Sequence, residues 1–262
     1  MKISAMWMTR KRSHELIYSV CSFLHKADDN NNIEYIFITD PDDTETVDAL
    51  EKLVPMAHAH GAEFTHISAP ERFGYGSLEK YQNAAAEQFS GECIISFADD
   101  NICLQQGWDT AIRTELIKRQ GTPAWLSITP LNELWKGYPT IVGINRAWYE
   151  KTGRFSGTRA TDIYISDLGT KANIQPMIPN IETLHLQRGR TTSEYQKNGT
   201  TRKIFCLPAE DDFGGIHAKK EIKPSVYHKD HKGMETKEHQ VTNYNLGKKI
   251  FQEDLNNLLG NT

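Results

Sequence analysis

The chain has 262 residues, of which 38% are hydrophobic and 24% are charged, and its formal net charge is −4. This length suits one large α/β domain or two small ones, and the composition excludes an intrinsically disordered chain. The charge gives no overall electrostatic footprint for nucleic acid, and no apolar run approaches the ~20 residues of a transmembrane helix.

The N-terminus and the cysteines indicate the compartment. The basic residues at 10–12 follow the first apolar run, which is the reverse of the order in a signal peptide. The four cysteines form no CxxC pair, and Cys21 and Cys93 lie in apolar runs, as buried reduced thiols do. We therefore expect a cytoplasmic protein.

The first half of the chain alternates predicted strands with predicted helices. Short apolar runs rich in β-branched residues predict the strands, and apolar residues at helical spacing predict the helices. The strands are expected at 2–8, 34–39, 63–68, 92–97 and 124–129, and the helices at 13–26, 44–54, 77–88 and 108–119. This order predicts an α/β, Rossmann-like fold of three α/β/α layers around a mostly parallel central sheet.

The second half is less regular. We expect strands at 140–145 and 182–186, short helices at 146–151 and 161–169, and an amphipathic helix at about 246–259 that packs back on the domain. The predicted domain covers 1–205, divided into a nucleotide-binding half (1–130) and an acceptor or catalytic half (131–205). The remainder, 206–262, is expected to be a polar C-terminal extension ending in that helix.

Three polar side chains follow the fourth predicted strand. Asp99, Asp100 and Asn101 come directly after a buried run, and adjacent carboxylates repel one another unless they are neutralised. Oxygen ligands suit Mg²⁺, Mn²⁺ and Ca²⁺, and ligands of open α/β sheets bind outside the carboxyl ends of the strands. The sequence therefore indicates a cation site that neutralises a diphosphate, with an ordinary strand-to-loop turn as the alternative.

Other polar loops are expected at the same edge of the sheet. They follow the first three strands and cover 9–12 (TRKR), 40–43 (DPDD) and 72–76, where Gly74 and Gly76 precede a helix. A glycine pair before a helix can cradle a phosphate through backbone N–H groups, although a simple turn has the same sequence. Four polar loops at one edge make a stronger prediction of a site than any one of them.

The pattern as a whole resembles the nucleotide-diphospho-sugar transferases of the GT-A fold, especially small family-2-like glycosyltransferases, some of them encoded by phages. The resemblance covers about the first 190 residues. It is carried by the opening strand with TRKR, the strand ending at Asp40 with Asp43 close by, the segment YQNAAAEQFSGE, the segment FADDN and, downstream, 139–153, Asp162 and His185.

The resemblance implies a nucleotide-diphospho-sugar donor, with a UDP-sugar as the first choice, and a glycan or other hydroxyl acceptor. It places the acids after the second strand at the base or ribose and Asn83 at the border of the nucleotide. The implied donor-binding residues are Thr9, Arg10, Arg12, Asp40, Asp43, Tyr75, Asn83 and Asp99.

The resemblance also implies a metal, Mn²⁺ or Mg²⁺, held by a D-x-D motif after the fourth strand. This sequence has Phe97 at the usual first position of the motif, so Asp99 matches its last acid and Asp100 follows. His185 matches a downstream histidine ligand of several such enzymes. The implied ligands are therefore Asp99, Asp100 and His185, and a histidine in an oxygen-rich site suits Mn²⁺ better than Mg²⁺.

The resemblance further implies a hexosyltransferase with a catalytic base at the start of the helix at 161–169. Asp162 matches this position and Asp167, farther along the helix, is the competitor. Inverting transfer needs a base that takes the proton of the acceptor hydroxyl. Two other classes stay open: a nucleotidyltransferase of related fold, which usually has a glycine-rich loop where this chain has TRKR, and a nucleotide- or sugar-binding module without catalysis, which Phe97 keeps open.

Overall fold

The computed structural model describes residues 1–131, 139–186 and 237–260, with the side chains of Tyr75 and of 237–245 left aside. Trp135 and Tyr138, which the sequence offers as aromatic rings to stack on an acceptor sugar, lie outside these residues. The predicted boundary at 205/206 and most of the polar extension lie outside them as well. The strands are β1 (Ile3–Thr9), β2 (Ile33–Thr39), β3 (Glu63–Ser68), β4 (Cys93–Ala98), β5 (Asn101–Cys103), β6 (Trp125–Ile128), β7 (Ile141–Asn145) and β8 (Thr183–His185).

Helices separate most of these strands. They are α1 (Ser13–Lys26), α2 (Thr44–Ala59), α3 (Leu78–Ala86), α4 (Trp108–Lys118), α5 (Arg146–Thr152), α6 (Thr161–Lys171) and α8 (Lys237–Leu259), with 3-10 turns η1 (Asn30–Asn32) and η2 (Tyr75–Ser77). The predicted elements are confirmed in kind and order. The bounds differ most in α8, which begins at Lys237 and not near 246, and in α2, which we expected to end before Pro55. The helix continues to Ala59 because its buried stripe of Leu50, Leu53 and Ala57 continues past the proline.

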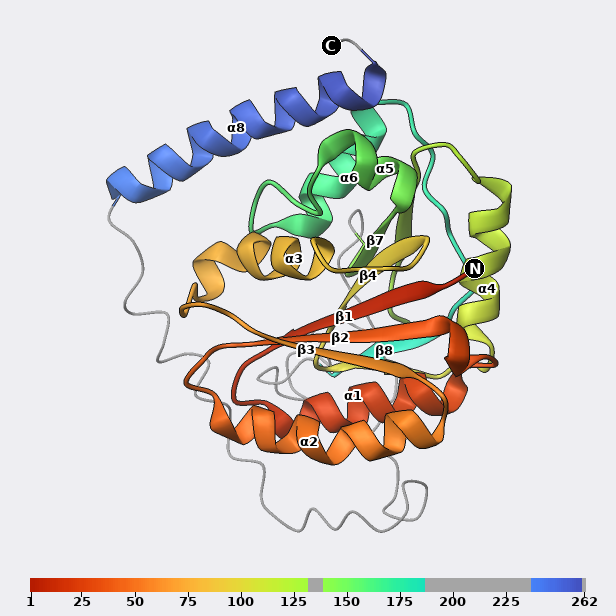
Figure 1. The fold of residues 1–262 in the computed structure, drawn as a ribbon. Coiled ribbons are helices and arrows are strands. Elements are labelled where there is room, and N and C mark those ends of the chain that lie inside the picture. Colours follow the sequence, from red (N-terminus) through yellow and green to blue (C-terminus); the bar gives the residue numbers. More distant parts are fainter. Residues whose placement is uncertain (132–138, 187–236, 261–262) are drawn as a thin grey trace, which may run out of the picture. The chain divides into compact units, whose positions relative to one another are not determined.

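A six-stranded sheet in the order β3-β2-β1-β4-β7-β6 forms the centre of the fold (Figure 1). The pairs β1–β2, β1–β4 and β2–β3 are parallel, whereas β7 is antiparallel to both β4 and β6. The sheet is therefore mostly parallel, as predicted. Because β7 inserts between β4 and β6, the strand predicted at 124–129 does not lie beside the one predicted at 92–97.

Successive residues of the strands pack on opposite faces, as the period of a β-strand requires. On one face Trp7 stacks with Phe37 and Phe97, and Phe23 of α1 contacts both Trp7 and Phe97. On the other face Met6, Ile36 and Ile94 belong to a buried cluster with residues of α3, α5, α6 and α8. Figure 1 shows α1 and α2 on the first side of the sheet and α3, α5 and α6 on the second.

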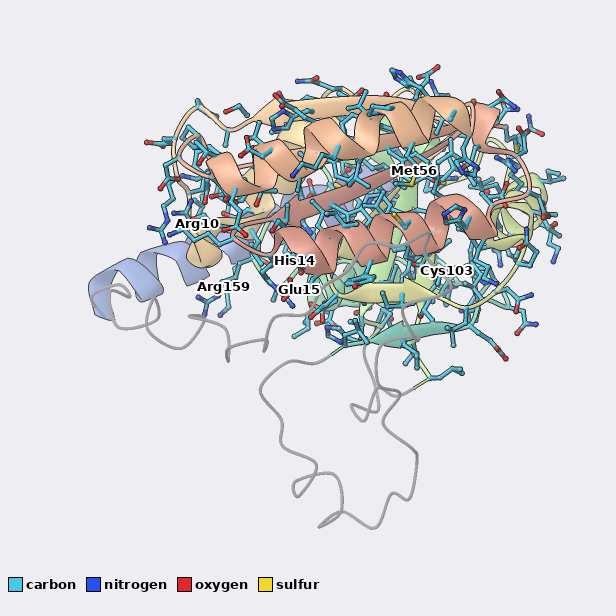
Figure 2. All side chains as sticks on the ribbon, turned by 90° about the horizontal axis from the view of Figure 1, so that it is seen from below. Arg10, His14, Glu15, Met56, Cys103 and Arg159 are labelled. Carbon is cyan, nitrogen blue, oxygen red and sulfur yellow. The ribbon has the colours of Figure 1, made fainter. Side chains whose placement is uncertain are left out.

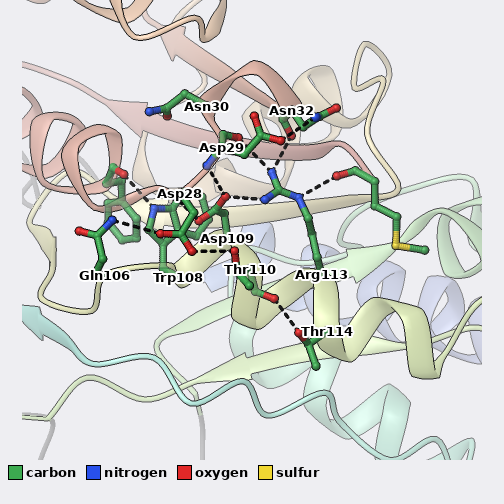
Figure 3. Close-up of polar contacts among 12 residues, drawn as sticks. Asp28, Asp29, Asn30, Asn32, Gln106, Trp108, Asp109, Thr110, Arg113 and Thr114 are labelled. Carbon is green, nitrogen blue, oxygen red and sulfur yellow. Dashed lines mark hydrogen bonds and ion pairs between the residues drawn. The ribbon is translucent and has the colours of Figure 1, made fainter.

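The loop between α1 and β2 is tied to the start of α4 by Asp109 (Figure 3). This carboxylate is fully buried and accepts hydrogen bonds from the backbone N–H groups of Asp28 and Asp29, at 2.8 and 3.0 Å. Arg113, one turn farther along α4, forms an ion pair with Asp109 and also donates to three backbone carbonyl groups. The two amides and the arginine together satisfy a charge that burial alone would make costly.

The C-terminal helix α8 packs against α5 and α6, as we expected of it. Asp254 of α8 is fully buried, accepts a short hydrogen bond from the Tyr164 hydroxyl of α6, and lies 3.2 Å from Nε of Arg154. Leu258 enters the same buried cluster as Met6 of β1. No helix within the described ranges is long and apolar enough to cross a membrane. Cys21 and Cys93 are buried and free, as predicted, and Cys103 is buried and free as well.

Candidate functional site

The parallel strands bring three polar loops to one edge of the sheet. Thr9 pairs with Thr39 across β1 and β2, and Met8 pairs with Ala98 across β1 and β4. The residues that follow these strand ends, Asp40 and Asp99, are therefore neighbours of Thr9. The Thr9 hydroxyl donates to Oδ2 of Asp99 at 3.0 Å, which joins the first and third loops directly. We call this edge the rim.

Arg12, the residue before α1, bridges the two acids that follow β4. Its Nη1 lies 2.6 Å from Oδ1 of Asp99, and its Nη2 donates to Oδ2 of Asp100 at 2.7 Å. Its Nε lies 3.9 Å from the carboxylate of Glu15, in the first turn of α1. One guanidinium therefore faces three acids, and all three acids are buried. Figure 2 shows Glu15 and His14 at the same end of α1 as Arg10.

Burial affects the two neighbouring acids differently. It raises the pKa of Asp99 to about 7, although the charge of Arg12 opposes the shift. Burial acts on Asp100 as well, but the hydrogen bond and charge of His185, together with Arg12, hold the pKa of Asp100 below its usual value. Asp100 is therefore the firmly ionised acid, whereas Asp99 depends on a neighbouring cation to stay ionised.

His185 reaches the rim because β8 pairs with β5 in a separate two-stranded sheet. The register places His185 opposite Asn101, and Nε2 of His185 lies 3.1 Å from Oδ1 of Asp100. His185 and Asp100, 85 positions apart in the sequence, therefore lie side by side, and their role as metal ligands stays a prediction. Asn101 is fully buried and its Oδ1 accepts from the backbone N–H of Ala98 at 2.7 Å, which closes the turn that carries both acids.

Arg10 organises the loop after β2. Its Nη1 donates to Oδ2 of Asp40 at 2.9 Å, and its two terminal nitrogens hold Asp42 at 2.5 and 2.8 Å. The other oxygen of Asp40 accepts a short hydrogen bond from the Tyr81 hydroxyl. Burial and this carboxylate raise the pKa of Tyr81 to about 12, so the hydroxyl stays a donor. Asp40 is buried with both oxygens engaged, and Asp42 is the exposed acid of the loop.

Asp43, predicted to contact the nucleoside, has a structural role at the start of α2. Its side chain caps the helix by accepting from the backbone N–H and the hydroxyl of Thr46. It also accepts from the backbone N–H of Lys11 at 2.8 Å, a residue whose φ of 52° lies in the left-handed region. Asp43 thereby holds the loop that aims Arg12 at the acids.

The glycine loop before α3 uses its N–H groups internally. The backbone N–H groups of Phe73 and Gly74 donate to the Tyr81 hydroxyl at 2.9 and 3.0 Å. Gly74 has a φ of 74°, which explains the glycine at this position. Because the N–H of Gly74 donates to Tyr81, we interpret this loop as a simple turn and not as a phosphate cradle. The Tyr75 side chain lies outside the described residues.

Asn83 fixes the segment that leads into α6. Its Oδ1 accepts from the backbone N–H groups of Phe155 and Ser156 at 2.8 and 3.1 Å, and its Nδ2 donates to the Ser156 carbonyl at 2.8 Å. All of its polar atoms are thus engaged with the backbone. Its contact with a nucleotide stays a prediction, and its observed role is to position the chain before α6.

The start of α6 is linked to β4 through Gln82. The hydroxyl of Thr161 donates to Gln82, whose amide donates to the Ser96 hydroxyl at 3.2 Å. Asp162 is half-buried in the first turn of α6 and directly follows Thr161. The start of α6 is therefore linked to β4, the strand that ends at the rim. Asp167 lies five residues later, about 140° around the helix, so the two acids face different directions.

Solved structures of glycosyltransferases share this architecture. TarS 1–349 from S. aureus superimposes with a TM-score of 0.52 at 15% identity, over 68% of this chain and 57% of its own. Its complex with UDP gives a TM-score of 0.53 over the same shares. The mannosyltransferase PcManGT from Pyrobaculum calidifontis, in complex with GDP-Man and Mn²⁺, gives 0.59 at 12% identity, over 74% of this chain and 59% of its own.

This chain has the GT-A fold. It spans less than two thirds of the length of either neighbour. No protein-family model and no curated protein matches its sequence. The predicted fold class is confirmed, and the resemblance to phage-encoded members stays a prediction.

The donor types at the rim fit a divalent cation, but their present arrangement is held by Arg12. Two carboxylates and an imidazole meet there, with Nε2 of His185 3.1 Å from the buried Oδ1 of Asp100. In the part of the chain that the structure describes, no three His, Cys, Asp or Glu side chains are grouped as metal ligands. Phe97 is buried between Trp7 and Trp108, so the first position of the GT-A acid motif supplies core packing here.

Sequence reasoning missed the residues that hold the rim together. Tyr81 and Gln82 stand in the quoted segment YQNAAAEQFSGE beside Asn83, and both turn out to be buried hydrogen-bonding partners of rim or helix residues. Arg12 was predicted to bind nucleotide, but not to bridge Asp99 and Asp100. The only sequence signal for this bridge was that a basic loop and acidic loops were predicted at the same edge of the sheet.

Proposed function

We propose that this chain is a glycosyltransferase that moves a sugar from a nucleotide-diphosphate donor to an acceptor hydroxyl. The observation that carries the proposal is the rim, where the loops after β1, β2 and β4 join Arg10, Arg12 and buried acids at the carboxyl edge of a GT-A sheet. Ligands of open α/β sheets bind at this edge.

The proposed donor is a nucleotide-diphospho-sugar, with a UDP-sugar as the first choice. The neighbouring structures were solved with UDP, UDP-GlcNAc and GDP-Man, which supports this donor class. Arg10 and Asp42 form the exposed edge of the rim, where a base or ribose can exchange hydrogen bonds with them. Asp40, with Tyr81, then serves as the support that orients Arg10.

Asp99, Asp100 and His185 would hold Mn²⁺ or Mg²⁺ in the loaded enzyme. The complex of PcManGT contains Mn²⁺, which supports a divalent cation as cofactor. Such an ion offsets the charge that grows on the departing diphosphate. The chain's own contribution is to keep both carboxylates at the rim through the Asn101 turn and to place His185 opposite them through β8.

Asp162 is the proposed base of an inverting transfer. Its carboxylate takes the proton of the acceptor hydroxyl as the hydroxyl oxygen attacks the anomeric carbon, and the bond from that carbon to the diphosphate oxygen breaks. The nucleoside diphosphate then leaves with the electron pair. The link from Thr161 through Gln82 to Ser96 supports this assignment, because it fixes the start of α6 relative to β4.

The test is the turnover of Asp162→Asn. Loss of a general base typically costs ~10²–10⁴ in rate, so we expect transfer to fall by this factor while nucleotide-sugar affinity is unchanged. Asp167→Asn, on the same helix but facing another direction, is the matched control and should be milder. The measurement is donor consumption, including slow hydrolysis, which needs no known acceptor.

Three results would contradict the proposal. Unchanged turnover in Asp162→Asn would place the base elsewhere or indicate a retaining mechanism. A parent protein that binds a nucleotide sugar but turns over none would be a binding module, the alternative that Phe97 in the core favours. Release of inorganic pyrophosphate from a nucleoside triphosphate would indicate a nucleotidyltransferase instead.

A further inference from the structure

One turn of α3 contacts segments that lie far apart in the sequence. Tyr81, Gln82 and Asn83 are consecutive, and successive residues of an α-helix point about 100° apart. Tyr81 and Gln82 are buried, and Asn83 is half-buried. The helix lies on the same side of the sheet as α5 and α6 (Figure 1). The three side chains therefore leave one turn of the helix toward different neighbours.

Tyr81 contacts two loops on the donor side of the proposed site. Its hydroxyl donates to Asp40, which also accepts from Arg10 of the loop after β1. The same hydroxyl accepts from the backbone N–H groups of Phe73 and Gly74. One oxygen atom thus ties the loop after β2 to the loop before α3.

Gln82 contacts the segment that carries the proposed base. Its side-chain carbonyl accepts from Thr161, the first residue of α6, and its amide donates to the Ser96 hydroxyl of β4 at 3.2 Å. All three side chains are buried, and hydrogen bonds inside a protein are electrostatically stronger than in water. Asp162 directly follows Thr161, so Gln82 ties the first turn of α6 to the strand that ends beside Asp99.

Two helices hold the segment before α6. Asn83 of α3 bonds to the backbone of Phe155 and Ser156. Gly157 lies so close to α8 that a Cβ at this position would meet Cγ2 of Ile250 at 2.5 Å. The chain therefore enters α6 along a path that is fixed by α3 and α8, and the contact with Gln82 sets where the helix begins.

We propose that this turn of α3 positions the donor and the base separately, through Tyr81 and Gln82. Tyr81 holds Asp40 and thereby the direction of Arg10, whereas Gln82 holds the start of α6 and thereby Asp162. Both are positioning residues, because they act through other groups of the chain. The inference rests on the proposed function, since it assumes a donor at the rim and a base at Asp162.

The experiment separates donor binding from turnover, in steady-state kinetics of the full chain with a UDP-sugar and Mn²⁺. Tyr81→Phe removes the hydroxyl that holds Asp40, so we expect the donor KM to rise roughly tenfold with kcat unchanged. Gln82→Met keeps the length of the side chain but removes both hydrogen bonds. Because a small misplacement of a reacting group is costly, kcat should fall by about tenfold to a hundredfold with KM unchanged.

Matched variants carry the same substitutions elsewhere. Tyr149→Phe changes a half-buried ring that packs against Phe89, and Gln88→Met changes an exposed residue beyond the end of α3. Both should match the parent in kcat and KM. Thr161→Val should reproduce the loss of kcat, and Thr161→Ser, which keeps the hydroxyl, should restore it. Thermal melts check that every variant folds.

A double variant shows whether Gln82 acts through Asp162. In the Asp162→Asn background there is no base to position, so adding Gln82→Met should lower kcat by no more than about twofold. Equal losses in the two backgrounds would overturn the role of Gln82, because a general loss of structure acts whether or not the base is present.

Two further measurements need no turnover. In the free protein, Gln82→Met should speed hydrogen exchange at the amide of Tyr164, which closes the first turn of α6 onto the carbonyl of Ala160 at 2.8 Å. Tyr81→Phe should leave this exchange unchanged. Calorimetry should show that UDP binds more weakly to Tyr81→Phe and equally well to Gln82→Met.

Failure of this inference is distinguishable from failure of the proposed function. Absence of turnover of any nucleotide sugar by the parent, or unchanged turnover of Asp162→Asn, would refute the proposed function. With that function intact, the inference is overturned if Tyr81→Phe and Gln82→Met change the same kinetic constant. In the free protein it is overturned by unchanged exchange at Tyr164 in Gln82→Met, or by equal UDP affinities of the two variants.

Discussion

Asp109 and the pair Asp99 and Asp100 are buried acids that face an arginine, yet their partners differ in kind. Asp109 accepts from two backbone amides as well as from Arg113, so its site is complete as built (Figure 3). The pair at the rim accepts from side chains. Backbone donors make an acid part of the fold, whereas side-chain donors leave it able to exchange partners with a ligand.

The largest effect is expected at Asp109. Asp109→Ala leaves Arg113 and two backbone amides without their acceptor, and breaking a buried pair in this way costs about 3–5 kcal/mol. We expect the free energy of unfolding in urea to fall by this amount. UDP affinity of the folded fraction should be unchanged. A loss below about 1 kcal/mol, or a selective loss of UDP binding, would break the distinction between the two regions.

An intermediate effect is expected at Asp254, whose partners are Tyr164 and Arg154, with Glu253 beside it. Burial raises the pKa of Asp254 from 3.8 to about 6. The folded state therefore binds a proton at Asp254 more tightly than the unfolded state does. The stabilisation of the folded state by this proton is complete below pH 3.8 and is lost as the pH rises through 6. The difference corresponds to roughly 3 kcal/mol.

The measurement is the free energy of unfolding of the parent minus that of Asp254→Asn, from pH 4 to pH 7. This difference should fall as the pH rises, because the asparagine does not titrate. A difference that is flat with pH, or that rises, would show that Arg154 keeps the carboxylate ionised throughout this range.

The smallest effect is expected at Asp43, which lies at the rim but is bonded to backbone amides like Asp109. Asp43→Ala removes the helix cap of α2 and should cost about 1 kcal/mol of unfolding free energy. Asp43→Asn, which can still cap, is the matched control and should cost less. If Asp43→Ala leaves stability unchanged but abolishes UDP binding, Asp43 belongs to the donor site after all.

Most of the fold was predictable because local patterns carry it. The 3.6-residue spacing of apolar residues predicted α1 at Ser13–Lys26, and the bounds of β3 match the segment EFTHIS at 63–68. The insertion of β7 between β4 and β6 was not predictable, since strand order depends on contacts between segments far apart in sequence. Pro55 misled the prediction of α2 because burial of Ala57 outweighs a missing N–H group.

The candidate site was predictable in its residue types but not in its pairing. Strand ends in a parallel sheet share an edge, so the meeting of Thr9, Asp40 and Asp99 could be expected. Which arginine meets which acid depends on loop geometry, such as the left-handed backbone of Lys11. The structural roles of Asp43 and Asn83 were unpredictable for the same reason. Their side chains bond to backbone groups, and a sequence motif does not show such contacts.

The contact of Leu258 with the cluster around Met6 has a consequence for the order of folding. Until α8 docks, Tyr164 of α6 lacks its partners Asp254 and Phe251. The core on one face of β1 is thus completed by a helix that lies far along the sequence. Contacts of such long sequence separation slow folding, so we expect the docking of α8 to be a late step in folding.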